Sequence, residues 1–215
     1  MSSELTVLTQ QENTLSVFSG ESKFNQAMMM AASLAKSDLI PANYKGKPEN
    51  CLIAIELSNR LALSPFLVMQ NMHVIQGRPS WSSSFIISCI NASGKFQGCL
   101  KFEIDEKKTK CRAYAIEKET GAKLVSPNIT LEMAEKEGWL TKNGSKWRTM
   151  PELMLRYRAA SFFGRLYCPE IMNGMLSVEE AKDIALPDEE EFIDVLAEPV
   201  EKEEVINEVE QPKLL

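Results

Sequence analysis

The chain has 215 residues, of which 44% are hydrophobic and 25% charged, a composition typical of a globular protein with a substantial core. It has no apolar run approaching the roughly 20 residues of a membrane span, and its first residues lack the features of a secretory signal, so we expect a cytoplasmic protein with no membrane partner. Five cysteines without a C-x-x-C pair, beside one histidine, exclude the usual zinc-finger spacings and predict reduced, buried thiols.

The formal net charge of −6 hides a strong asymmetry along the chain. Residues 1–93 carry six basic and six acidic side chains, residues 94–165 carry fifteen and nine, and residues 166–215 carry three and fifteen. The middle region is therefore net +6 and the last region net −12. A basic region followed by an acidic one predicts two functional regions, the first suited to a polyanion.

The N-terminal part of the chain is predicted to be helical after a flexible leader. Residues 1–22 are polar and show no sustained period, whereas apolar residues then recur at helical spacing. Prolines are expected to open two of the helices, at Pro48 and Pro65, because proline suits the first helical turn. The predicted helices cover residues 24–36, 48–63 and 65–71.

The central part predicts a turn, a helix and a small sheet. Gln76-Gly77-Arg78-Pro79 is typical of a tight reversal, and residues 82–91 are predicted to be helical. Polar and apolar residues then alternate with period two, which predicts short antiparallel strands with one solvent-exposed, basic-leaning face. These strands cover residues 99–104, 110–116 and 122–125.

The remaining elements complete an α+β fold in which a short antiparallel sheet packs with several helices. A helix over 130–137 is expected to begin at the N-cap Thr130, and a polar loop follows to residue 148. A longer helix covers 151–167. We expect the core to span residues 23–186 and residues 187–215 to form an acidic, disordered tail.

The helix over 151–167 is apolar on two nearly opposite sides, which predicts a central helix packed on both. Between those sides, Arg158 and Arg165 share one stripe and lie about 10.5 Å apart along the axis. They are predicted to hold successive phosphates, with pairing to acids from other elements as the alternative. Arg156 follows Glu152 by four residues, so a local ion pair is the alternative to DNA contact there.

Binding a single strand without sequence preference needs a basic groove and flat side chains for the bases. The predicted groove residues are Lys45, Lys47, Arg78, Lys95, Lys101, Lys110, Arg112, Lys146, Arg148, Arg156, Arg158 and Arg165. The predicted stacking residue is Trp81, with Tyr44, Trp139 and Trp147 as further candidates, and packing in the core is the alternative for each. There is no nucleotide-binding G-x-x-x-x-G-K-[ST] loop, so any annealing is expected to be ATP-independent.

Four stretches resemble the RecT/Redβ superfamily of phage single-strand annealing proteins. They are residues 44–59, Leu63-Ser64-Pro65-Phe66, 73–96, and 151–166 with Glu179-Glu180 after them. The resemblance implies a ring- or filament-forming α+β core that binds DNA in a basic groove, and it places DNA-contacting residues at Lys45, Arg158 and Arg165. The sequence departs from lambda-type members at Val68, Glu152 and Leu153, where those members have basic residues.

The sequence thus predicts ATP-independent annealing of complementary strands in phage-type recombination, with no covalent chemistry, cofactor or metal. Its expected partners are single-stranded DNA, the annealed duplex, other copies of the chain, and a phage exonuclease or host single-strand binding protein, all in the bacterial cytoplasm. The alternatives are a general strand-coating protein and a magnesium-dependent nuclease built on Glu103, Asp105 and Glu106-Lys107-Lys108. The tail is interpreted as a solubilising segment, a DNA mimic or a docking site.

Overall fold

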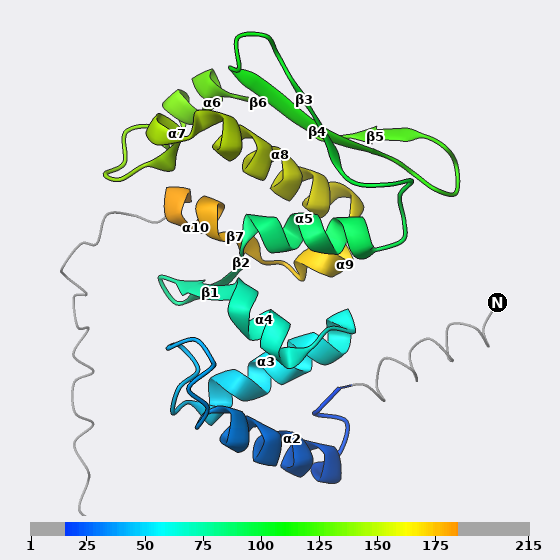
Figure 1. Cartoon of the computed structure of the whole chain (residues 1–215), viewed down its shortest axis with the longest axis vertical. Helices are drawn as coiled ribbons and strands as arrows, with labels where there is room; N and C mark the ends of the chain where they lie inside the picture. The colour runs from blue at the N-terminus through cyan, green and yellow to red at the C-terminus, as the bar shows by residue number, and fades with distance from the viewer. Residues whose placement is uncertain (1–15, 185–215) are drawn as a thin grey trace, which may run out of the picture. The chain divides into compact units, whose positions relative to one another are not determined.

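The computed structural model describes residues 16–184, which adopt a mixed α+β fold (Figure 1). The helices of this part are α2 (Glu21–Leu34), α3 (Pro48–Leu61), α4 (Pro65–Asn71), α5 (Ser83–Ala92), α6 (Leu131–Lys136), α7 (Lys146–Thr149), α8 (Pro151–Tyr167), α9 (Pro169–Met172) and α10 (Val178–Ile184). Its strands are β1 (Met72–Ile75), β2 (Arg78–Trp81), β3 (Lys101–Ile104), β4 (Lys110–Ile116), β5 (Lys123–Val125), β6 (Ile129–Thr130) and β7 (Leu176–Ser177).

The prediction of a flexible leader over residues 1–22 is wrong for residues 16–22. Val17 is 4% exposed, and its backbone N–H donates to Glu56 Oε2 of α3 at 2.8 Å. Helix α2 then begins at Glu21, earlier than the apolar period suggested, because polar residues form its first turn. Residues 1–15 of that prediction lie outside the described residues.

Helices α3 and α4 begin at the two prolines, as predicted. Helix α3 ends at Leu61 because Ala62 adopts the left-handed conformation (φ 52°), two residues before the predicted end. Between residues 16 and 184, no single helix is both long and apolar enough to cross a membrane; α3 and α4 pass that test only as a pair, with a bend of 111° between them.

The predicted reversal at 76–79 is a hairpin between β1 and β2. Gln76 and Gly77 both have positive φ values (45° and 74°), as a tight hairpin turn requires. The C-terminal strand β7 joins β2 in parallel, with Trp81 opposite Ser177, which the sequence did not predict.

The larger sheet is antiparallel, with strand order β3-β4-β5 and with β6 pairing to the start of β4. Alternate residues of β4 are buried, so Cys111, Ala113 and Ala115 are at most 2% exposed. Helix α8 packs against this side of the sheet (Figure 1). The predicted period-two pattern is therefore confirmed, with one face buried and the other facing solvent.

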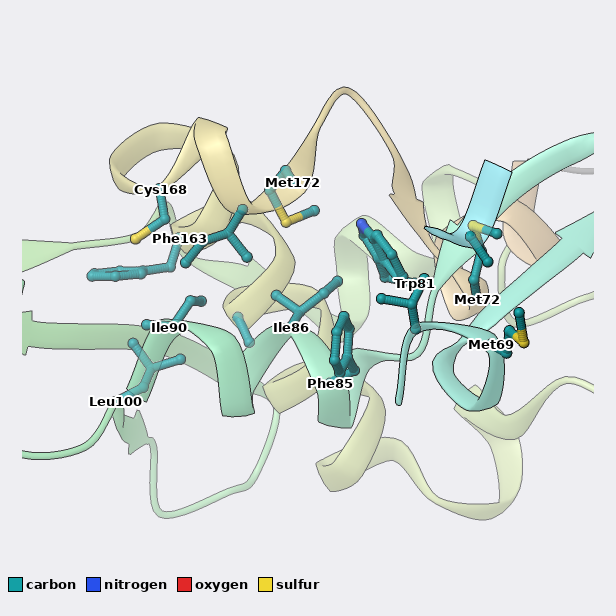
Figure 2. Packing of buried hydrophobic residues seen from close by; sticks show 14 of the residues in the cluster. Met69, Met72, Trp81, Phe85, Ile86, Ile90, Leu100, Phe163, Cys168 and Met172 are labelled. Atoms are coloured by element: carbon teal, nitrogen blue, oxygen red, sulfur yellow. The ribbon is translucent and has the colours of Figure 1, made fainter. Parts of the chain in front are cut away.

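Helix α8 lies at the centre of the core, as predicted, between the sheet and helices α5, α9 and α10. Figure 2 shows Ile86 and Ile90 of α5 packing toward Phe163 of α8 and Met172 of α9. Gly164 permits this close approach, because a Cβ there would lie 3.0 Å from Met172 Sδ. The buried sides of α8 differ from those predicted, since Phe163 is fully buried, whereas Leu153 and Leu166 are 37% and 55% exposed.

The chain after α8 contains structure that the sequence interpretation missed, namely α9, β7 and α10. Helix α10 begins with a reciprocal capping box. The Glu180 N–H donates to Ser177 Oγ at 3.1 Å, and the Ser177 N–H donates to Glu180 Oε2 at 3.0 Å. The predicted acidic tail, residues 187–215, lies outside the described residues.

Candidate nucleic-acid interface

The strongest candidate site is the solvent side of the larger sheet, here called the outer face. Cross-strand partners in an antiparallel sheet lie on the same side, as do alternate residues along a strand. The register pairs Lys101 with Tyr114, Glu103 with Arg112, and Ile116 with Lys123. The polar members of the outer face are therefore Lys101, Glu103, Lys110, Arg112, Tyr114 and Lys123.

The outer face is positively charged, because it carries four cations and one carboxylate. Glu103 accepts from Arg112 Nε and from Lys123 Nζ, both at 2.6 Å. Hydrogen bonds from Lys123 and then Arg112 hold the pKa of Glu103 below its usual value. Lys101 and Lys110 are exposed, and within residues 16–184 neither is placed in an ion pair, so both are available to a polyanion.

Tyr114 places an aromatic ring on this charged surface. The ring is partly exposed, and Lys123 Nζ lies 4.2 Å from its centroid. A flat ring framed by cations offers a stacking surface for a base and neighbouring charges for the flanking phosphates. Sheet-borne aromatic residues bind single strands in other domains by the same principle.

The acids of the alternative nuclease site serve the β3–β4 hairpin. Asp105 Oδ1 accepts the backbone N–H groups of Thr109 (2.8 Å) and Lys110 (2.7 Å), which closes the turn. Glu103 is engaged by its two cations. Among residues 16–184 no group of three His, Cys, Asp or Glu side chains is arranged to hold a metal ion.

The prediction that Arg158 forms the floor of an open phosphate groove is wrong. Its side chain is 4% exposed and pairs with Glu180 (Nη1 to Oε1, 3.4 Å) and with Asp183, both on α10. Burial lowers the pKa of Arg158 and raises that of Asp183, in each case against the opposing influence of the ion pair. The structure therefore confirms the alternative prediction, in which Arg158 pairs with acids from another element.

Arg165 does project the same way as Arg158, as the helical spacing predicted. It also pairs with Glu180, although its side chain is 37% exposed. Arg156 forms the predicted local ion pair with Glu152 at 2.7 Å. Lys108 reaches the same carboxylate at 3.0 Å, so these two cations share one acid.

The aromatic candidates for base stacking are wrong. Trp81 is 0% exposed and packs against Phe85, with ring centroids 4.9 Å apart. The other three are also buried: Tyr44, Trp139 and Trp147 are at most 7% exposed. Their polar sequence surroundings suggested open loops, but the chain turns all three rings into the core, and Trp147 lies in α7.

The remaining predicted cations lie on separate elements. Lys45 and Lys47 precede α3, and Lys45 pairs with Asp38 at 3.1 Å. Arg78 is exposed at the β1–β2 turn, and Lys95 pairs with Glu170 at 2.7 Å. Lys146 and Arg148 are exposed on α7. Of the thirteen predicted residues, the structure therefore gathers Lys101, Lys110 and Arg112 on the outer face.

Two residues of the outer face, Lys123 and Tyr114, were not predicted as site residues. The alternation of Lys110, Arg112 and Tyr114 in β4 placed the ring on the polar face. Lys123 depended on the register of β5, which composition and spacing do not specify.

No protein-family model, curated protein or solved structure matches this chain.

Proposed function

We propose that the chain binds single-stranded DNA on its outer face and promotes annealing of complementary strands without a nucleotide cofactor. The observation that carries this proposal is the presence of four cations and the Tyr114 ring on one exposed sheet face, with α8 packed beneath it. Backbone phosphates suit the cations, and one base suits the ring. None of these groups distinguishes one base from another, so binding is general.

Annealing follows from charge neutralisation in this proposal. Alternate residues of β4 are about 6.8 Å apart, so Lys110, Arg112 and Tyr114 form a row along which a strand can lie. Two strands repel through their phosphates, and cations bound to one strand reduce that repulsion. Base pairing then supplies the free energy, and no covalent step is needed. A general coating protein would bind equally well but would not speed pairing.

The exposed apolar surface of α2 supports self-association, which would align several outer faces along one strand. Met29, Met30 and Phe24 are 76%, 47% and 37% exposed. The charged residues of this helix, Glu21 and Lys23, lie in its first three positions, so the rest of its surface is uncharged. Met29 and Met30 are adjacent in this helix and could contact a second copy of the chain. We propose a homo-oligomer, ring or filament, that acts in the cytoplasm of a bacterial host with an exonuclease or host single-strand binding protein.

The test is oligonucleotide affinity after Lys101→Gln and Lys110→Gln. The logarithm of the binding constant falls linearly with the logarithm of the salt concentration, and each phosphate contact contributes about 0.7 to this salt slope for single strands. Loss of two contacts should therefore reduce the slope by about 1.4 and weaken binding about 25-fold at 0.1 M salt. The matched control is Lys36→Gln with Lys136→Gln, two exposed lysines on other elements.

Annealing of two complementary oligonucleotides should be measured without ATP, with Mg²⁺ present and the strands inspected afterwards. Accelerated pairing of intact strands supports the proposal. Cleaved strands would support the nuclease alternative, and equal affinity of the double variant and its control would exclude the outer face as the binding surface.

A further inference from the structure

A groove of about 490 Å³ lies at the N-terminal end of α8, where α7 leads into that helix (Figure 1). Its lining comes from two separate parts of the chain. The β3–β4 hairpin contributes Lys108, and residues 149–153 and Arg156 contribute the rest. We call this site the α8 groove. It is separate from the outer face, because α8 packs against the opposite side of the sheet.

The α8 groove exposes apolar side chains that stay outside the core. Met150 and Leu153 are 42% and 37% exposed. A methionine side chain adapts to irregular apolar surfaces, which suits it to contact with a partner. None of the described residues that line the groove is aromatic, so it offers no ring on which a nucleic-acid base can stack. The lining therefore suits an apolar side chain of a protein better than it suits a base.

The rim of the α8 groove carries more cations than acids. Lys108 and Arg156 both pair with Glu152, at 3.0 and 2.7 Å, so two cations share one carboxylate. Their side chains are 66% and 41% exposed, which leaves both accessible to a further anion. The exposed charged residues close to the lining residues in sequence are Lys107, Arg148 and Glu106. Four cations and two acids give this surface a net positive charge.

We propose that the α8 groove binds a partner protein through an acidic peptide segment that carries a large apolar side chain. The apolar side chain packs on Met150 and Leu153, and the flanking carboxylates pair with the cations of the rim. Guanidinium has five N–H donors, so Arg156 can bind a second carboxylate while it keeps Glu152.

Charge complementarity selects this occupant over a neutral or basic segment, which would gain the apolar contact alone and would be repelled by the rim if it were basic. The inference goes beyond the proposed function, because the α8 groove is separate from the outer face and its occupation requires no DNA.

The first test measures the fluorescence anisotropy of a labelled peptide that is titrated with the full chain. The peptide has a central Phe-Leu pair with alternating Glu and Asp on both sides. One control peptide replaces Phe-Leu by Ser-Ser, and the other replaces every acid by its amide. Each control should bind about fivefold more weakly or worse, because one apolar anchor or one ion pair contributes about that factor. Equal binding of the acidic peptide and either control overturns the proposal.

The second test locates the peptide with variants of the full chain. Lys108→Gln with Arg156→Gln, and separately Met150→Ser, should each weaken binding of the acidic peptide by about fivefold. The matched controls are Lys136→Gln, which removes the cation of another exposed ion pair, and Leu39→Ser, which removes another exposed apolar side chain. Both controls should bind like the wild type. Equal affinity of the groove variants and their controls overturns the proposal.

The same variants reveal a different occupant. If Lys108→Gln with Arg156→Gln weakens oligothymidine binding as much as peptide binding, the groove belongs to a nucleic-acid surface and the proposal is overturned. If Met150→Ser lowers the molar mass measured by light scattering, the occupant is a second copy of the chain, and the proposal is again overturned. Weaker peptide binding with unchanged oligothymidine affinity and unchanged molar mass supports a protein partner.

Discussion

Replacement of Arg158 by alanine should destabilise the fold far more than replacement of Arg156 in the same helix. Arg158 is 4% exposed and its partners Glu180 and Asp183 are 2% and 9% exposed, so its removal leaves buried Asp183 without its ion-pair partner and Glu180 with Arg165 alone. Breaking a buried pair in this way costs about 3–5 kcal/mol. For a domain of this size each kcal/mol lowers the melting temperature by about 2–4 °C, so we expect a decrease of about 6–20 °C.

Arg156 is the matched control, because its ion pair with Glu152 is 41% and 37% exposed. Solvent screens such pairs, and their contribution is about 0–1 kcal/mol. Thermal unfolding followed by circular dichroism at pH 7 should therefore show a decrease of at most about 4 °C. Equal, small decreases for the two variants would mean that Arg158 is not buried in an ion-pair network.

The destabilisation by Arg158→Ala should also depend on pH. Burial raises the pKa of Asp183 above its unfolded value, so the folded state holds this proton to a higher pH than the unfolded state does. The stability that folding gains from the protonated Asp183 is present at low pH and is lost as the pH rises through the folded pKa. Without Arg158 the charged carboxylate of Asp183 has lost its ion-pair partner and keeps the hydrogen bond from Trp147 Nε1. The difference in stability between variant and wild type should thus be larger at pH 7 than at pH 4.5, and the opposite order would contradict the assignment.

Three further predictions follow from other parts of the structure. Tyr114→Leu should weaken binding of oligothymidine by about 1–3 kcal/mol in fluorescence anisotropy, whereas Tyr114→Phe should not, because stacking needs only the ring; similar losses in both would argue against stacking. Glu103→Gln should raise that affinity severalfold, since the outer face loses its one carboxylate, and a decrease would contradict the charge argument. Exposed Cys99 should be alkylated at pH 8 and detected by mass spectrometry, while Cys168, whose pKa burial raises to about 11, should resist; equal labelling would mean that Cys168 is accessible.

Local patterns predicted most of the regular elements well. Helices α4 and α8 begin at prolines and have the predicted bounds, because proline in the first turn is a strong local signal. Strand β4 also matches its predicted bounds, since alternation with period two depends only on neighbouring residues. The N-cap role of Thr130 is confirmed by its acceptance of the Met133 N–H at 3.0 Å.

The C-terminal elements were missed although one local signal was present. Ser177 and Glu180 have the S-x-x-E spacing of a capping box, which marks the start of α10. Strand β7 has two residues and pairs with β2 across nearly a hundred positions, so no local period announces it. The burial of Trp139 and Trp147 depends in the same way on contacts with residues far along the chain.

The sequence by itself determined the α+β class, the order of the main elements, the central helix and the existence of a basic strand face, because spacing along the chain sets which residues share a side. Only the tertiary structure decided which cations are available. Arg158 lies 22 and 25 positions from the acids that bury it, while Lys123 reaches Glu103 across 20 positions to complete the outer face. The free energy of a charge depends on its solvent exposure and its neighbours in space, and neither can be read from its place in the chain.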